Sequence, residues 1–131
     1  MGYTYFQPNH LDTKDEYGDC VIRALCNVFD KTWIETFNII VPYEIKYQCP
    51  ISCMPLKLYK EVMSELGFEY IGISNRKGTK RPTVKEFAKK NKDGVYILSL
   101  ANHWSSVKDG SYYDTWDCGD KCLYGYFKLR S

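Results

Sequence analysis

The fold is decided by residues 95–116, which read VYILSLANHWSSVKDGSYYDTW. Residues 95–100 are β-branched, aromatic and apolar, as is typical of a buried strand. Residues 103–107 and 112–116 have strand-forming composition and flank a turn at Lys108-Asp109-Gly110-Ser111. Asp-Gly between two such runs is the strongest short-range signal for a β-hairpin. We therefore expect an antiparallel sheet here, to which residues 123–129 add another strand.

The segment CVIRALCNVF, residues 20–29, precedes this sheet. Its apolar residues recur at helical spacing, which predicts an amphipathic helix. Gly18 and Asp19 stand where the amino-terminal cap belongs. Cys20 is therefore expected in the first turn of a helix.

Other helix signals lie between this segment and the sheet. Thr32 and Glu35 form a capping-box pattern, and the helix that they open is expected to end before Pro42. Residues 43–54 are expected to be a loop, and residues 55–67 a helix that begins at a proline and is closed by a glycine. A second capping box, at residues 83–86, starts a short helix.

The order of these elements defines a fold class. Residues 68–73 are expected to form a short strand, and residues 1–18 an irregular arm over the surface. Helices followed by antiparallel strands predict an α+β protein, with amino-terminal helices packed on a carboxy-terminal antiparallel sheet. The length of 131 residues predicts one domain spanning residues 1–131.

Charge argues against two classes of partner. The net charge of +2 gives no basis for binding nucleic acid or an anionic membrane, which usually requires a basic patch. The densest basic stretch, residues 76–81, is expected to be an exposed loop. No segment has the ~20 apolar residues needed to span a bilayer.

Targeting signals are not evident either. The first ten residues lack the regions of a signal peptide, and Phe6 breaks the myristoylation motif that Gly2 suggests. We expect a cytoplasmic protein. Its six cysteines are then expected to be thiols or metal ligands rather than a disulfide framework.

Cys20 is the candidate nucleophile. A thiol attacks as the thiolate, and the free N–H groups and dipole of a helix amino terminus lower its pKa. The same N–H groups can donate to an oxyanion. Cys26 lies further along the helix and is expected to be a core thiol.

His103 is the candidate base, and the hairpin supplies its partner. With the turn at Asp109-Gly110, Ser105 faces Asp114 and His103 faces Trp116. Side chains on one face repeat every second residue, so Asp114 is the diagonal neighbour of His103. Asp114 is therefore the expected orienting carboxylate, with Asp117 held in reserve.

The motif GDCVIRAL, residues 18–25, resembles the nucleophile motif of small papain-like cysteine peptidases from bacteria and their phages. Residues 103–116 are similar to the second half of the same pattern. A more distant likeness is to ovarian-tumour-type deubiquitinases, whose motif reads Asp-Gly-Asn-Cys followed by Arg and a small residue; here Tyr17 replaces the first Asp. The resemblance implies a papain-like fold and a Cys20–His103–Asp114 triad.

The resemblance also implies an oxyanion-hole amide ahead of the nucleophile. Gln7 and Asn9 are the only amides upstream of Cys20, and Gln7 is preferred. The implied reaction is acyl transfer from an amide or isopeptide of a peptide or protein substrate, by a monomer that needs no cofactor or metal.

Two alternatives remain open. Cys49 and Cys53, and Cys118 and Cys122, are pairs of equal spacing that would form a structural four-thiolate zinc site or disulfides. In the second alternative, the chain is an inactive papain-like binding module, for example an anti-defence or partner-capturing protein. The complete Cys, His and Asp set favours the enzyme.

Overall fold

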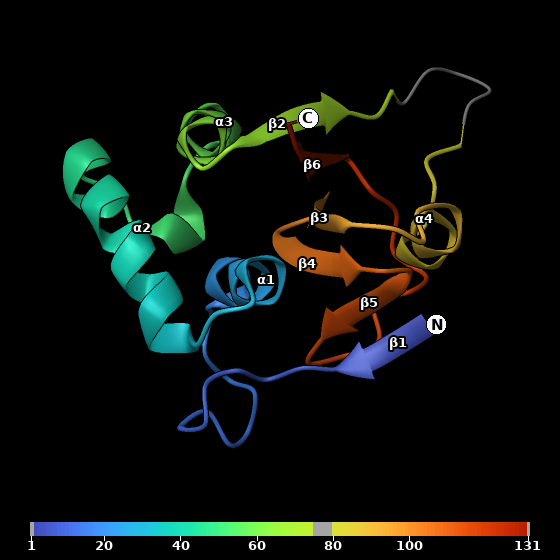
Figure 1. Cartoon of the computed structure of the whole chain (residues 1–131), viewed down its shortest axis with the longest axis horizontal. Coiled ribbons are helices and arrows are strands. Elements are labelled where there is room, and N and C mark those ends of the chain that lie inside the picture. Colours follow the sequence, from blue (N-terminus) through green and yellow to red (C-terminus); the bar gives the residue numbers. More distant parts are fainter. Residues whose placement is uncertain (1, 75–79, 131) are drawn as a thin grey trace.

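The computed structural model describes residues 2–74 and 80–130. Within these residues the chain is α+β, with four α-helices and one six-stranded sheet, and three of the helices precede most of the strands (Figure 1). The predicted class and order of elements are confirmed.

The sheet has the strand order β1-β5-β4-β3-β6-β2. Its strands are β1 Gly2–Tyr5, β2 Phe68–Gly72, β3 Val95–Leu100, β4 His103–Lys108, β5 Ser111–Asp114 and β6 Gly125–Leu129. All neighbours are antiparallel except β1 and β5, which are parallel. The sheet is therefore mixed, and the expectation of a purely antiparallel sheet was wrong.

The first residues of the expected irregular arm form that parallel edge strand. Tyr3 pairs with Tyr112, its ring lies 5.7 Å from the Tyr112 ring, and its hydroxyl donates to the Asp114 carbonyl. These contacts depend on residues more than 100 positions apart in the sequence, so local patterning gives no signal for them.

The hairpin has the expected register. Val107 pairs with Tyr112, and Lys108 with Ser111. Asp109 and Gly110 both have positive φ, of 51° and 86°, as a two-residue turn between twisted strands requires. This register brings the carboxyl end of β5 beside the start of β4.

The helices are α1 Cys20–Phe29, α2 Trp33–Tyr47, α3 Leu56–Glu65 and α4 Val84–Lys90, with a short 3₁₀ helix at Ile51–Cys53. Both predicted capping boxes form, at Thr32 with Glu35 and at Thr83 with Glu86. However, α2 continues through Pro42, so the expected end before this proline was wrong. Tertiary contacts hold the later turns: the Glu44 carboxylate accepts the Ile51 N–H, and Tyr47 packs against the core.

Helices cover both faces of the sheet. In Figure 1, α1, α2 and α3 lie on one side of the strands and α4 on the other. Successive side chains of β3 point to opposite faces of the sheet. Ile97 therefore packs in the core with α1, and Leu98 packs in the core with α4. Helix α1 packs on β4, where the Asn27 amide donates to the Ser106 hydroxyl at 2.9 Å.

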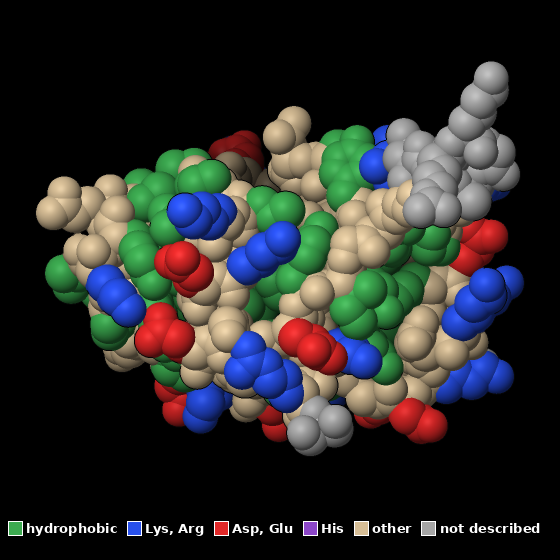
Figure 2. All heavy atoms as spheres, turned by 90° about the horizontal axis from the view of Figure 1, so that it is seen from above, with side chains coloured by type: hydrophobic (Ala, Val, Ile, Leu, Met, Phe, Trp, Pro, Cys, Tyr) green, Lys and Arg blue, Asp and Glu red, His purple; other side chains and the backbone are tan. Residues whose placement is uncertain are grey.

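Charge is mixed on the surface. On the face shown in Figure 2, basic and acidic side chains are interspersed rather than gathered by sign. Residues 76–79 of the basic stretch lie outside the described residues. No helix of the described residues is long and apolar enough to cross a membrane.

Burial of α1 should control stability. Leu25 is 0% exposed, whereas Leu11 is 82% exposed. Leu25→Ala is expected to lower the free energy of unfolding by ~2–5 kcal/mol because it leaves a cavity in the core. Leu11→Ala, the matched control, is expected to change it by less than ~0.5 kcal/mol. Urea unfolding followed by circular dichroism measures both, and equal effects would contradict the described packing.

Candidate active site

Cys20 is the first residue of α1, as the sequence predicted. Asp19 occupies the N-cap position, but its side chain makes no capping hydrogen bond. Instead its carboxylate accepts from the Arg23 guanidinium at 2.5 Å and from the Trp33 indole N–H at 2.9 Å. The first turn of α1 is thus anchored to its own next turn and to α2, and the thiol stands at a helix terminus rich in free N–H groups.

His103 and Asp114 come together across the hairpin. The Nε2–H of His103 donates to Oδ2 of Asp114 at 2.7 Å. Oδ1 of Asp114 accepts the Thr115 N–H at 2.8 Å. The same His103 ring lines one cleft with Cys20, and the two residues shift each other's pKa. Because Nε2 is held by the carboxylate, Nδ1 is the nitrogen left for the sulfur.

The surroundings of Cys20 favour the thiolate. Burial raises the pKa of the thiol, but hydrogen bonds from His103 and the Trp104 backbone, with the charges of His103 and Arg23, lower it more. The net result is a Cys20 pKa below the ordinary value of a cysteine.

His103 is held in its protonated form. Burial lowers the pKa of His103, but the hydrogen bonds and charges of Asp114 and Cys20 outweigh this and raise it to about 9. Burial raises the pKa of Asp114, but the His103 hydrogen bond and charge, with further hydrogen bonds, lower it below the ordinary value. Below about pH 9 the proton therefore resides on the imidazole, between the Asp114 carboxylate and the Cys20 sulfur.

Arg23 is a residue that the sequence analysis did not single out. Its side chain is 9% exposed, and its Nη2 lies 3.6 Å from Oδ1 of Asp114. It therefore links the carboxylates of Asp19 and Asp114. Its placement four residues after Asp19 was a readable i, i+4 ion-pair signal, but the contact with Asp114 requires the tertiary fold.

The reserve carboxylate has a different role. Asp117 accepts the Tyr112 hydroxyl at 2.6 Å and the Gly119 N–H at 3.0 Å. Trp116, expected opposite His103, lies beyond the end of β5 with its ring 5.1 Å from the imidazole. It covers one side of the base.

Gln7 is not brought to the thiol. Its amide donates to Asp15 at 2.9 Å and to Asp12 at 3.3 Å, because the acidic segment after it folds back over the arm. Gln7 does not line the pocket that contains Cys20, whereas Asn102, in the β3–β4 turn, does. The free N–H groups of the first turn of α1 are the oxyanion donors that the geometry favours.

The positions of Cys49, Cys53, Cys118 and Cys122 do not support the zinc alternative. Cys118 is buried beside Ser105 and Asp114, 3.5 and 3.6 Å from their oxygens, while Cys49 donates to the Pro50 carbonyl. In residues 2–74 and 80–130, no three His, Cys, Asp or Glu side chains cluster so as to hold a metal ion. All four are free thiols.

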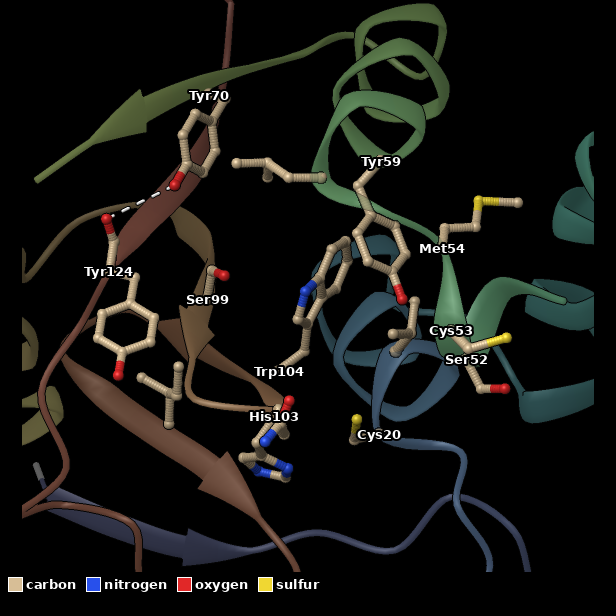
Figure 3. Close-up of a pocket in the computed structure, with 14 residues that line it drawn as sticks. Cys20, Ser52, Cys53, Met54, Tyr59, Tyr70, Ser99, His103, Trp104 and Tyr124 are labelled. Carbon is tan, nitrogen blue, oxygen red and sulfur yellow. Dashed lines mark hydrogen bonds between the residues drawn. The ribbon is translucent and has the colours of Figure 1, made fainter. Parts of the chain in front are cut away.

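Cys20 and His103 open into a cleft of about 540 Å³. Figure 3 shows the two side chains at one end, below Trp104 and Tyr59, which come from β4 and α3. Comparisons with family models, curated proteins and solved structures found no match for this chain. The geometry places a thiol, an imidazole and a carboxylate together at an accessible cleft.

Thiol reactivity tests this geometry. Cys20 is expected to react with iodoacetamide at a pH below the ordinary cysteine range, and His103→Ala is expected to move its labelling curve to higher pH, because both contributions from the imidazole are lost. Peptide mapping by mass spectrometry measures each cysteine separately.

The other thiols provide internal controls. Burial raises the pKa of Cys118 to about 12, so it should label slowly in the folded protein and as fast as the rest in urea. Labelling of Cys20 no faster than that of exposed Cys53 at any pH would contradict an activated thiol.

Proposed function

We propose that this chain is a papain-like thiol hydrolase that cleaves amide or isopeptide bonds, with Cys20 as nucleophile, His103 as general base and acid, and Asp114 as the orienting carboxylate. The observation that carries the proposal is the position of the His103 ring, whose Nε2 lies 2.7 Å from Oδ2 of Asp114 and which lines the same cleft as the Cys20 thiol. This arrangement supplies the nucleophile, base and orienting group that acyl transfer through a thiol requires.

Acylation follows from the protonation states. The Cys20 thiolate attacks the carbonyl carbon, a C–S bond forms, and the carbonyl electron pair moves to the oxygen. The resulting oxyanion is stabilised by N–H groups of the first turn of α1. When the oxyanion collapses, the C–N bond breaks and His103 gives its proton to the departing amine. A thioester remains on Cys20.

Deacylation reverses the proton movement. Neutral His103 removes a proton from water, and the resulting hydroxide adds to the thioester carbonyl. Collapse breaks the C–S bond, releases a carboxylic acid and restores the thiolate beside the imidazolium. Asp114 keeps the ring orientation throughout, because its Oδ2 is fixed on Nε2.

The topology supports the papain-like assignment. The nucleophile begins a helix early in the chain, and the base and carboxylate lie on adjacent antiparallel strands after it. The helix packs directly on the strand that begins with the base. We infer a cytoplasmic monomer acting on a peptide or protein, by a chemistry that needs no metal or cofactor.

Covalent trapping tests the proposal. Incubation with casein peptides or peptidyl aminomethylcoumarins should give a mass increase at Cys20 equal to the acyl group, followed by product release. Cys20→Ala should lose both. Cys49→Ala, a matched change at a thiol that does not line the cleft and does not contact the three site residues, should keep both. An unchanged release rate in Cys20→Ala would overturn the proposal, and retained folding without turnover in the original protein would favour the binding module.

The pH dependence of kcat/KM provides a second test. The rate should rise as Cys20 loses its proton below the ordinary cysteine pKa, and fall as His103 loses its proton at about 9. Asp114→Asn removes a contribution that raises the pKa of His103, so the upper limb should move to lower pH. The maximal rate should fall ~10²–10⁴-fold because the ring loses its fixed orientation. An upper limb that stays at about 9 would contradict the role of Asp114.

A further inference from the structure

The cleft extends well beyond the reacting atoms. Its volume of about 540 Å³ is within the range of small-ligand pockets and exceeds what one side chain fills. In Figure 3 it runs from Cys20 and His103, past Trp104 and Tyr59, to Tyr70 and Tyr124. It therefore has room for about two residues of a peptide.

The lining of the cleft is rich in aromatic side chains and has few charged groups. None of the fourteen described residues that line it is Lys, Arg, Asp or Glu. The Tyr59 ring contacts Trp104 at 4.7 Å, and its hydroxyl donates to the Ile51 carbonyl at 2.7 Å. Because this hydroxyl is satisfied within the fold, the two rings offer apolar surface. Such a wall stabilises an apolar group and penalises a charge that it leaves without a partner.

Two cations lie beside the aromatic rings at the end of the cleft away from Cys20. The Lys60 ammonium lies 4.9 Å from the centre of the Tyr70 ring, and the Arg81 guanidinium 4.5 Å from the centre of the Tyr124 ring. Among the described residues, neither cation has a carboxylate within 4 Å. This end should therefore accept an anion more readily than a cation.

Two pockets share His103. The cleft contains both Cys20 and His103, whereas a second pocket of about 290 Å³ contains His103 and Trp116 without Cys20. The acyl group stays on the sulfur, and the leaving amine departs from the imidazole that protonates it. The large cleft is therefore on the acyl side of the scissile bond.

The following inference rests on the proposed hydrolase activity. We propose that the substrates carry apolar or aromatic residues in the two positions on the acyl side of the scissile bond. In the next position outward they carry an acidic or neutral residue, not a basic one. Trp104, Tyr59 and Leu100 contact the apolar pair, and Lys60 and Arg81 select the outer residue. The protein thus reads the sequence of its substrate with residues from α3, β3, β4 and the segment before α4.

Peptidyl acyloxymethyl ketones test this specificity, because they place the acyl-side residues in the cleft while alkylating Cys20. Probes with Leu-Phe next to the ketone should label Cys20 ~10–100-fold faster than Ser-Gly probes. With Leu-Phe kept, Glu in the next position should label ~3–10-fold faster than Lys, and the difference should shrink in 1 M salt because exposed charges are screened.

Charge reversal tests whether Lys60 and Arg81 determine the preference for the outer residue of the substrate. Lys60→Glu with Arg81→Glu should invert the preference for Glu over Lys and leave the Leu-Phe preference unchanged. Lys89→Glu provides the matched control, since it reverses an exposed charge on α4, across the sheet from the cleft. Iodoacetamide, which has no peptide part, reports the reactivity of Cys20 in every variant.

The outcomes separate the two proposals. Fast iodoacetamide labelling of Cys20, together with equal rates for all peptidyl probes, would overturn the specificity and leave the hydrolase standing. A Glu preference that survives the double reversal would overturn the role of Lys60 and Arg81. Iodoacetamide labelling of Cys20 no faster than that of Cys53 would remove the hydrolase and, with it, the specificity that rests on it.

Discussion

The carboxylate of Asp114 is only 3% exposed, and a buried charge of this kind costs several kcal/mol unless it is neutralised and hydrogen-bonded. Four partners meet this requirement: the His103 ring, the Thr115 N–H, the Cys118 thiol and the Arg23 guanidinium. Arg23, His103 and Cys118 come from different parts of the chain and meet at the same two oxygens. The demand of one buried charge therefore sets the geometry of the site.

The need to neutralise Asp114 also constrains the position of the helices. Arg23 can reach Asp114 only when α1 lies across the strands, and Asp19 holds the other side of the guanidinium. Asp19 also accepts the Trp33 indole, which ties in the start of α2. Since Cys20 lies between Asp19 and Arg23, its sulfur is fixed relative to His103 by ion pairs on both sides of it in the sequence.

Local signals in the sequence predicted most of the fold and the placement of Cys20, His103 and Asp114. The Asp-Gly turn determined the hairpin register, and that register was sufficient to choose Asp114 over Asp117. The helix beginning at Cys20 was readable from periodicity and capping residues. Signals of this kind span a few residues, and the chain follows them wherever tertiary contacts agree.

The sequence did not predict what depends on distant contacts. Two such contacts are the parallel pairing of β1 with β5 and the contact of Arg23 with Asp114, which join segments with no shared local pattern. The continuation of α2 through Pro42 likewise depends on tertiary packing. Gln7 is a second example of this limit of prediction from local sequence. Its amide was chosen by position upstream of Cys20, but Asp12 and Asp15 are nearer partners in the folded arm.

The charges of the site alternate in sign along one connected path: Asp19, Arg23, Asp114 and His103. Because Arg23 and the Thr115 N–H already stabilise Asp114 as an anion, and the pKa of this carboxyl is lowered, the imidazolium proton is not passed to it. The opposite side of the ring is open to Cys20 and the cleft. A proton that leaves His103 therefore moves toward the cleft, which is the direction that protonation of a leaving amine requires.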